Sequence, residues 1–495
     1  MRLGFKRKRV WSRILALAIA SLVLAFFGTN SAQAQDAAPA SAAAVDTAWV
    51  LLTGFLVFFM QTGFAMLETG LIRQTSAVNA LLENFIDAGI TAVAFWAVGF
   101  GVAFGASAGG FIGTSNFFLS DAMSFADGGV SYARFAAYPN LDVLTFFFFQ
   151  FAFAATASTI TTGAMAERTD FVGDLIYSAI MGGISYPIIV HWIWGGGWLA
   201  QQGFHDFAGS TVVHTVGGIT ALVGAIMLGP RAFRWKNGKW QPNPPAHNLG
   251  LATIGTMILW FGWYGFNPGS TLGLGNTGLV GLVTLNTTLG AAGGTLVSMF
   301  IQYFRTKKWD LTYSMNGALA GLVAVTAGCA FVSPPAALLI GLVAGAVVIY
   351  AAELIERLHI DDPVGAFAVH AACGIWGTLA IGLFGQPGLT FAPAGVDVAT
   401  RAGLLMGGGI DLLIVQLIGS GATIAFTAVF AFVMFGALKA IGRLRVNKIV
   451  DDVNVFIDDY EHGVSVWPDV REAEEALGID PQHKAAGAKA AAIGD

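Results

Sequence analysis

Charge is scarce in this chain. Only 11% of its 495 residues are charged and 55% are hydrophobic, whereas roughly a quarter of the residues of a soluble domain carry charge. The composition therefore excludes an ordinary soluble domain. The basic residues are scattered in short segments, so nucleic acid is not an expected partner. The only two cysteines, Cys329 and Cys373, lie in apolar stretches and are expected to pack as small apolar residues without a disulfide.

Long apolar runs are what the chain has instead. They recur between residues 46 and 436, and each is about 20 residues long, enough to cross a hydrocarbon core of about 30 Å. We predict an all-α polytopic membrane protein with eleven spans. The predicted spans are 46–71, 82–107, 144–165, 171–194, 208–229, 248–268, 278–303, 312–331, 334–357, 363–385 and 403–436.

The first 34 residues have the pattern of a secretory signal peptide. A basic start at residues 6–9 precedes an apolar segment at 14–27 that is too short to span, and Ala32-Gln33-Ala34 has the spacing of a cleavage site. We expect cleavage after Ala34, which leaves residues 35–45 as a short periplasmic segment. The alternative is an uncleaved signal anchor.

Basic residues support this orientation. With the mature N-terminus outside, eleven spans put the C-terminus in the cytoplasm, and the positive-inside rule tests that arrangement. Only Arg134 and Arg401 fall outside. Fourteen basic residues fall inside: Arg73, Arg168, Arg231, Arg234, Lys236, Lys239, Arg305, Lys307, Lys308, Arg357, Lys439, Arg443, Arg445 and Lys448. We therefore expect a multi-pass protein of the bacterial inner membrane.

An internal repeat relates the fifth and tenth spans. Residues 206–214, DFAGSTVVH, align with residues 362–370, DPVGAFAVH, and the glycines continue in register as Gly218 with Gly374. Because the two spans are five apart, the copies cross the membrane in opposite senses. This is the pattern of a five-plus-five inverted repeat with a functional site near the midplane, to which an eleventh helix is added.

The repeat places two histidines at one depth. His214 and His370 follow Asp206 and Asp362 by eight residues, about 12 Å of helix. Ionisable side chains at that depth usually face a pore or a partner, although a hydrogen-bonded pair between helices is the structural alternative. A metal site would need further ligands, which the sequence does not supply, so a proton relay and a polar rail for a neutral solute remain open.

Three carboxylates have structural interpretations. Asp206 and Asp362 each stand at an expected helix start, where a carboxylate accepts backbone N–H groups as an N-cap, although Asp206 could also help indirectly in the binding or deprotonation of a solute. Glu68 lies in an apolar run near the end of the first span. We expect it to be a hydrogen-bonded structural carboxylate rather than a proton site.

Five motifs follow one another along the chain: Asp46-Thr-Ala-Trp49, Gly163-Ala-Met-Ala-Glu-Arg168, Asp206 to His214, Trp263-Tyr-Gly-Phe-Asn267-Pro-Gly-Ser270, and Asp361-Asp362-Pro363 with His370. In this order they resemble the ammonium transporter superfamily (Amt/Mep/Rh), and the likeness covers residues 46 to 446.

The resemblance implies a homotrimer with one pore in each protomer and neither a cofactor nor an enzyme activity. Trp194, Ser270 and Phe149 match the family's outer ammonium site, and Phe153 and Phe266 match its stacked phenyl gate. We expect Trp263, in the sixth-span motif, to have a structural role. Ammonium or methylammonium would bind at the outer site and lose a proton near the gate. Ammonia would then pass His214 and His370 while the proton follows separately, which makes transport electrogenic.

Two other functions compete with ammonium transport. A Rh-like channel for neutral ammonia or carbon dioxide is disfavoured, because such relatives tend to lack counterparts of Trp194 and Ser270. An ammonium sensor is the second alternative, and against it stands the short sequence after the last span.

The tail at 437–495 resembles the family's regulatory tail only in pieces. Leu444-Arg445-Val446 and Glu461-His462-Gly463 are similar to it, whereas the residues between them and Val464-Ser-Val-Trp467 depart from it. The family's tail usually docks a cytoplasmic PII signalling protein. The departures put PII regulation of this chain in doubt, and we expect the end of the tail to be disordered.

Overall fold

The computed structural model describes residues 40–126, 129–135, 138–389, 401–446, 457–464 and 466. The predicted signal peptide, most of the predicted periplasmic segment, and the tail beyond Val446 except for residues 457–464 and 466 lie outside the described residues.

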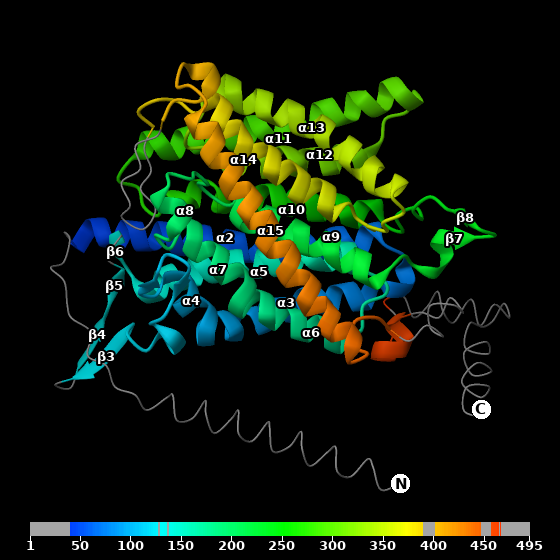
Figure 1. The fold of residues 1–495 in the computed structure, drawn as a ribbon, viewed down its shortest axis with the longest axis horizontal. Helices are drawn as coiled ribbons and strands as arrows, with labels where there is room; N and C mark the ends of the chain where they lie inside the picture. Colours follow the sequence, from blue (N-terminus) through cyan, green and yellow to red (C-terminus); the bar gives the residue numbers. More distant parts are fainter. Residues whose placement is uncertain are drawn as a thin grey trace, which may run out of the picture.

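Long helices lying side by side make up the molecule (Figure 1). Among the described residues, ten helical segments are long and apolar enough to cross a membrane, and Leu311–Thr326 is a shorter apolar helix. The predicted all-α polytopic fold is confirmed. The α-helices are α2 (Ala40–Leu71), α3 (Ala77–Ala94), α4 (Phe100–Phe104), α5 (Val143–Met165), α6 (Phe171–Ile180), α7 (Tyr186–Ile193), α8 (Trp198–Gln201), α9 (Val216–Leu228), α10 (Leu249–Phe266), α11 (Thr277–Thr306), α12 (Leu311–Thr326), α13 (Pro334–Arg357), α14 (Cys373–Phe384) and α15 (Asp411–Ala440).

Several of these helices are joined into one span by a π-helical turn. The π-helical turns are η2 (Phe95–Gly99), η4 (Met181–Ser185), η5 (Ser210–Thr215), η8 (Phe367–Ala372) and η11 (Asp458–His462). Short 3-10 helices occur in the connections. They are η1 (Gln74–Ser76), η3 (Phe117–Leu119), η6 (Ala232–Arg234), η7 (Pro268–Thr271) and η10 (Leu404–Met406).

Several predicted boundaries were wrong by four residues or more, and the structure gives a reason for three of them. The last span begins at Asp411 rather than 403, because Gly407 and Gly409 have positive φ and interrupt the helix. The second span begins at Ala77 rather than 82, where Asp458 of the tail accepts the backbone N–H groups of Val78 and Asn79. The eighth helix ends at Thr326 rather than 331, since residues 327–331 form turns.

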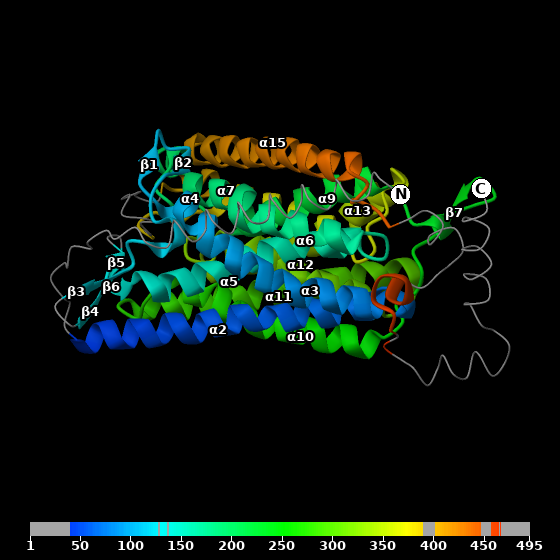
Figure 2. The same cartoon turned by 90° about the horizontal axis from the view of Figure 1, so that it is seen from below.

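Short hairpins mark the two ends of the bundle, as Figure 2 shows. We call the end with β1 to β6 the hairpin face and the end with β7, β8 and most of the arginines the basic face. The strands are β1 (Ser107–Ala108), β2 (Ile112–Gly113), β3 (Met123–Ala126), β4 (Gly129–Tyr132), β5 (Arg134–Phe135), β6 (Tyr138–Asp142), β7 (Trp235–Lys236) and β8 (Lys239–Trp240), and each pairs antiparallel with its neighbour.

The centre of the bundle is helix α5. Every residue of α5 from Phe149 to Met165 is buried, and the helix contacts α2, α3 and α9. The eleventh helix, α15, crosses the outside of the bundle diagonally (Figure 1) and contacts α9 and α14. Helix α5 therefore lies in the middle of the protein.

The inverted repeat is visible in the backbone. In each copy an aspartate is followed by a left-handed glycine, a π-helical turn and an α-helix: Gly209 (φ +117°), η5 and α9 in one, and Gly365 (φ +83°), η8 and α14 in the other. Arg231, beyond the end of α9, bonds Asp361, before the start of η8. The two copies thus run in opposite directions.

Candidate functional site

The two repeat histidines meet in the centre of the bundle. His214 lies in η5 and His370 in η8, their Nδ1 atoms are 3.1 Å apart, and their rings stack with centroids 5.2 Å apart. Glycines let the two turns approach. A methyl group on Gly218 would lie 2.4 Å from the nitrogen of Ala371, and one on Gly374 would lie 2.4 Å from the carbonyl oxygen of Ser210. The register that aligned these glycines in the sequence therefore also brings the histidines together.

The contact between the histidines determines which atoms are free. Each neutral imidazole carries one N–H, and the Nδ1 to Nδ1 hydrogen bond takes one of the two protons. The other proton then lies on the Nε2 of the second ring. His214 Nε2 has no hydrogen-bond partner among the described residues. The pair can therefore offer a passing molecule one N–H donor and one bare nitrogen.

Aromatic rings cover the histidines on the side of the hairpin face. His214 stacks on Trp263, with centroids 5.2 Å apart, and on Phe266, at 5.4 Å. Phe153 in turn covers Phe266, with centroids 4.1 Å apart. Trp263 is held by its indole N–H, which donates to Thr326 Oγ1 at 2.8 Å. Phe153 and Phe266, the predicted gate pair, thus lie between the histidines and the hairpin face.

A small cavity of about 30 Å³ lies above these rings. Phe149, Trp194 and Ser270, the predicted recruitment residues, all line it. The other lining residues are Phe104, Tyr138, Phe146, Gln150, Phe153, Phe207 and Leu272. A volume of this size is comparable to that of one water molecule, so the cavity suits a single small ion.

Two oxygens can accept hydrogen bonds in this cavity. The Ser270 hydroxyl donates to the carbonyl oxygen of Phe266 at 2.7 Å, which leaves the lone pairs of its Oγ for another donor. Gln150 Oε1 has no partner among the described residues. Aromatic faces attract cations, so the lining combines π faces with acceptors. An N–H cation fits this chemistry better than an anion does.

Asp206 lies just outside the cavity and acts on the backbone. Its carboxylate accepts the N–H groups of the four residues from Gly209 to Val212 at 2.8–3.0 Å. Burial raises the pKa of Asp206 to about 6, although these four bonds oppose the shift. The Trp194 indole N–H donates to the Asp206 carbonyl oxygen at 2.7 Å. Asp206 therefore fixes both the turn that carries His214 and one wall of the cavity.

Asp46 fixes the opposite wall. Its carboxylate accepts the N–H of Leu274 at 2.8 Å and the side-chain amide of Asn140 at 2.6 Å. The Trp49 indole N–H donates to Thr271 Oγ1 at 3.2 Å. The first motif of the sequence thus anchors the loop that carries Ser270.

The cavity beside the second repeat copy is wider. Asp362 accepts the N–H groups of Gly365, Ala366 and Phe367 at 2.9–3.0 Å, and so caps the turn that carries His370. Burial raises the pKa of Asp362. A cavity of about 430 Å³ opens beside it on the basic face, and Asn316, Val364 and Glu353 are among its lining residues. The structure therefore has a narrow aromatic cavity toward the hairpin face and a wider cavity on the basic face.

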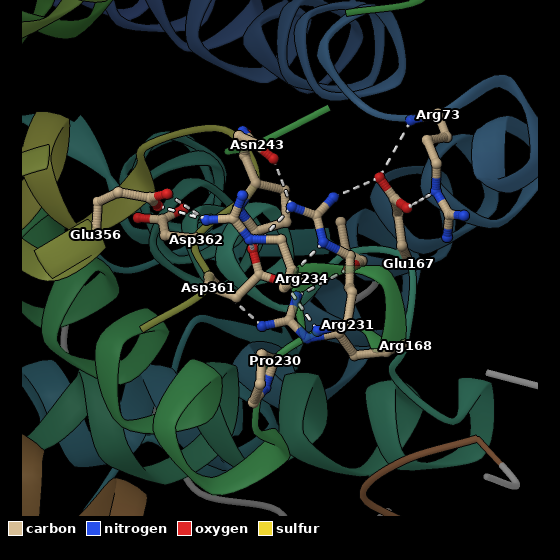
Figure 3. A network of polar contacts seen from close by, with 12 residues as sticks. Arg73, Glu167, Arg168, Pro230, Arg231, Arg234, Asn243, Glu356, Asp361 and Asp362 are labelled. Carbon is tan, nitrogen blue, oxygen red and sulfur yellow. Dashed lines mark hydrogen bonds and ion pairs between the residues drawn. The ribbon is translucent and has the colours of Figure 1, made fainter. Parts of the chain in front are cut away.

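A network of ion pairs, drawn in Figure 3, adjoins the wide cavity, because Asn243, Glu356 and Asp362 line that cavity. Arg231 bridges Glu167 at 2.6 Å and Asp361 at 2.8 Å. Arg73 bonds Glu167 from the other side, and Arg234 pairs with Asp361 and with Glu356. Burial would raise the pKa of Glu167, but Arg231 and Arg73 outweigh it and hold that pKa below its ordinary value. Glu167 is therefore ionised.

The two tail pieces singled out in the sequence dock on the basic face. Val446 N donates to Arg168 O, and the Arg445 guanidinium donates to the carbonyl oxygens of residues 228–230. Asp458 caps α3, and His462 Nε2 lies 2.9 Å from Asn79 Oδ1. The divergent residues 447–456 and Trp467 lie outside the described part.

Sequence reasoning missed several residues near the site. Phe104, Tyr138 and Phe207 wall the small cavity, and no motif marked them. Glu83, Asp87 and Asp174 are buried carboxylates in the bundle, and only Glu68 of this group was noticed. The i,i+4 spacing of Glu83 and Asp87 within an apolar run was a signal that could have found them. Among the described residues no group of three or more histidine, cysteine or acidic side chains could hold a metal ion.

The chain is similar to known proteins over nearly its whole length. The sequence model of the Ammonium Transporter Family matches residues 48–466. The chain is 38% identical to the ammonium transporter Amt2 of Archaeoglobus fulgidus, over 92% of this chain and 95% of that protein. It is 35% identical to ammonium transporter 3 of Dictyostelium discoideum, over 89% of this chain and 99% of that protein.

Solved structures show the same likeness. The structure of a Sensor Amt Protein matches with a TM-score of 0.76 and 37% identity, over 85% of this chain and 99% of that one. Candida albicans Mep2 matches with a TM-score of 0.73 and 29% identity, over 82% and 87% of the two chains. The chain therefore belongs to the ammonium transporter family, whose members are membrane transporters and not enzymes.

Proposed function

We propose that this protein takes up ammonium by separating it into ammonia and a proton. NH4+ binds in the cavity formed by Phe149, Trp194 and Ser270, and it loses a proton beside Phe153 and Phe266. Ammonia passes His214 and His370 to the basic face. The proton crosses separately, so that each ammonia is accompanied by one positive charge.

The observation that carries this proposal is one contiguous series of contacts. Phe149 contacts Phe153, Phe153 contacts Phe266, Phe266 contacts His214, and His214 contacts His370, with ring centroids 4.1–5.4 Å apart. Ammonia has both donor and acceptor capacity, and the histidine pair supplies the complement of each.

Selectivity for NH4+ over K+ follows from the apolar, water-free rings that lie between the small cavity and the histidines. A bare cation that leaves the small cavity loses its water and meets apolar rings, which costs many kcal/mol. NH4+ can avoid that cost by giving up a proton. K+ has no proton to lose, so it pays the full desolvation cost. The same reasoning admits methylammonium as a substrate, because methylammonium also has a proton to give up.

Proteoliposomes provide the test of this function. We expect ammonium pulses to evoke currents on solid-supported membranes and labelled methylammonium to accumulate, whereas K+ at equal concentration evokes none. Replacing both histidines, His214→Ala with His370→Ala, should let K+ carry current. His359→Ala, at an exposed position outside the pore, is the matched histidine control. Equal currents from K+ and ammonium through the unmodified protein would refute the proposal.

An ammonium sensor is the second candidate. The likeness to the Sensor Amt Protein favours it, and a sensor could use the same small cavity to bind its ligand. The two functions differ in turnover. A sensor would bind ammonium in the reconstituted protein without accumulating methylammonium inside the vesicles.

We also propose the setting in which the protein works. The hairpin face lies on the periplasmic side of a bacterial inner membrane and the basic face in the cytoplasm, which agrees with the positive-inside rule. The protein assembles as a homotrimer. A PII protein is a candidate partner for the basic face, and a pull-down with and without residues 446–495 would test this interaction.

A further inference from the structure

A larger cavity lies beside the small one on the hairpin face. Its volume is about 230 Å³, and we call it the antechamber. Its lining comes from the start of α2, from strand β6 and from the stretch between η7 and the start of α11. Strand β6 contacts α2, and Figure 1 draws the two side by side at that end of the bundle.

The antechamber shares a wall with the small cavity and reaches the protein surface. Tyr138 and Leu272 line both cavities. Pro139, Gly275 and Asn276, which line the antechamber alone, are exposed. A solute that arrives at the hairpin face can therefore enter the antechamber without crossing the bundle, and there it lies next to the small cavity.

Asp46 is the one charged side chain in the described lining of the antechamber, and it is only 8% exposed. In the described part of the chain, no basic side chain lies within ion-pair distance of it. Arg134 donates instead to the carbonyl oxygen of Pro139, and it lines a separate cavity together with Asp142. A buried carboxylate without a positive partner is costly, so the antechamber favours a cation.

The hydrogen bonds of Asp46 leave half of its accepting capacity unused. A carboxylate has about four lone-pair sites, but Asp46 accepts only two donors, the N–H of Leu274 and the side-chain amide of Asn140. Asp206, which caps the turn that carries His214, accepts four. The anchoring of the loop therefore does not account for the whole carboxylate of Asp46.

Gly273 leaves the carboxylate of Asp46 uncovered. A methyl group on Gly273, which also lines the antechamber, would lie 2.7–3.0 Å from Oδ1, Cγ and Oδ2 of Asp46. The φ angle of Gly273 is not positive, so the backbone conformation does not require glycine here. The missing side chain leaves space directly beside the two carboxylate oxygens, where a cation would bind.

The volumes of the two cavities suit different states of one ion. Water occupies about 30 Å³ per molecule in the liquid, so the antechamber has room for a cation with several water molecules. The small cavity of about 30 Å³ has room for the ion alone. Removing water from a cation is costly unless other groups replace it. A carboxylate beside the small cavity can hold the ion while its water is exchanged for aromatic faces and the Ser270 hydroxyl.

We propose that the antechamber binds hydrated monovalent cations through Asp46, and that it holds NH4+ next to the small cavity before the ion loses its water. The proposal rests on the proposed function, because the small cavity receives the ion that Asp46 holds. Carboxylate and water ligands do not distinguish NH4+ from K+, which has the same charge and a similar radius. K+ therefore competes with ammonium in the antechamber, although it is rejected at the aromatic rings that follow.

Rubidium tests this site without any transport. Rb+ resembles K+, and its anomalous X-ray scattering identifies it in a crystal. Crystals of the unmodified protein in rubidium chloride should show a peak beside the Asp46 carboxylate, and crystals of Asp46→Asn should show none. Asp121→Asn removes an acid of the same face outside the antechamber and should keep the peak. The absence of a peak beside Asp46 in the unmodified protein would overturn the proposal.

Currents in proteoliposomes test the role of the antechamber in uptake. Asp46→Asn should raise the half-saturating ammonium concentration about threefold or more, because a negative charge no longer concentrates cations at the entrance. The maximal current should change little. At constant ionic strength, replacing N-methylglucamine by K+ should raise the half-saturating concentration of the unmodified protein but not that of Asp46→Asn. Asp121→Asn should behave like the unmodified protein.

An exchange variant separates the charge of Asp46 from its anchoring role. Asp46→Asn with Asn140→Asp keeps one amide and one carboxylate across the same 2.6 Å contact. Asn140 also lines the antechamber, so the exchange returns the negative charge to the cavity. We expect it to restore both the half-saturating concentration and the competition by K+. An exchange variant with an unchanged melting temperature that still behaves like Asp46→Asn would overturn the proposal.

The outcomes separate this site from the proposed function. If Asp46→Asn changes neither the half-saturating concentration nor the competition by K+, the antechamber site is overturned and the proposed function stands. If Rb+ binds beside Asp46 while the unmodified protein carries no ammonium current and accumulates no methylammonium, the proposed function is overturned and the cation site stands.

Discussion

The two halves of the inverted repeat share one backbone pattern but border different cavities. We call the small cavity beside Trp194 and Ser270 the aromatic mouth, and the wide cavity beside Asp362 with its ion pairs the charged mouth. Asp206 and Asp362 cap equivalent turns, Gly209 and Gly365 adopt left-handed conformations, and each turn carries one histidine. The residues just before the caps differ. His205 N donates to Gln416 in a neutral setting, whereas Asp361 is paired with Arg231 in a charged one.

This difference matches the work proposed for each mouth. The aromatic cavity of about 30 Å³ can hold a cation without a neighbouring ion pair, so the cation is free to lose a proton. At the wide cavity of about 430 Å³, ammonia needs no binding site, and the charges serve structure. One scaffold can thus position both histidines while each mouth is specialised by side chains outside the repeat.

The largest expected effect concerns the charged mouth. Arg231→Met should lower the free energy of unfolding by about 3–5 kcal/mol, because Glu167 and Asp361 would lose a buried partner. Thermal unfolding in detergent would measure it. Arg305→Met removes an exposed pair with Glu353 and should cost at most about 1 kcal/mol. Similar losses in both variants would show that the network at this mouth is not structural.

The two caps allow a direct comparison of the halves. Asp206→Asn leaves two backbone N–H groups facing an amide instead of an oxygen, whereas Asp362→Asn leaves one. An unsatisfied buried donor costs about 1–3 kcal/mol, so Asp206→Asn should destabilise the protein about twice as much. Equal losses would contradict the hydrogen-bond count.

The pH dependence of stability sharpens the same comparison. The pKa of Asp206 is raised to about 6 in the folded protein, above its value of about 3.9 in an unfolded chain. Between these two pH values the folded state therefore binds the proton more tightly than the unfolded state does. The unmodified protein should therefore gain stability relative to the Asp206→Asn variant as pH falls from about 6 to about 4. The measurement is the difference in melting temperature across that range.

The sequence contained enough information to predict this scaffold. Hydropathy gives the spans because each must cross lipid, and the aligned glycines, Gly218 with Gly374, predict that two turns cross closely. The spacing of Phe149 and Phe153 predicts two rings one helical turn apart, as observed. These features depend on contacts that are local or repeated.

Side chains from unrelated segments could not be predicted in this way. Phe104, Tyr138 and Phe207 meet in the small cavity only because the hairpins fold over the bundle. Asp174 lies near Asp87 because α6 packs on α3. Hydropathy predicts which residues lie in spanning helices, but it does not predict which residues of other helices they contact.

Ammonium binding in the aromatic mouth can be weakened by removing the Ser270 hydroxyl. Ser270→Ala removes an acceptor whose proton is already committed to Phe266, and hydrogen bonds to charged groups are worth about 1.5–3 kcal/mol. We expect the half-saturating ammonium concentration to rise about tenfold or more, with the maximal current little changed. Thr277→Ala, at an exposed hydroxyl outside the cavity, is the control. An unchanged half-saturation would remove Ser270 from the binding site.

The smallest effect concerns residues 457–464 of the tail, which dock on the basic face at the start of α3. Asp458 accepts the N–H groups of Val78 and Asn79 at 2.8–2.9 Å, and burial raises the pKa of Asp458 to about 6. Asp458→Ala should weaken docking by about 1 kcal/mol, the usual value of an N-cap, and hydrogen exchange should rise in residues 457–464. Because the aromatic mouth lies at the other end of the bundle, exchange around Ser270 should stay the same. A change at both ends would show that the two mouths are coupled through the bundle.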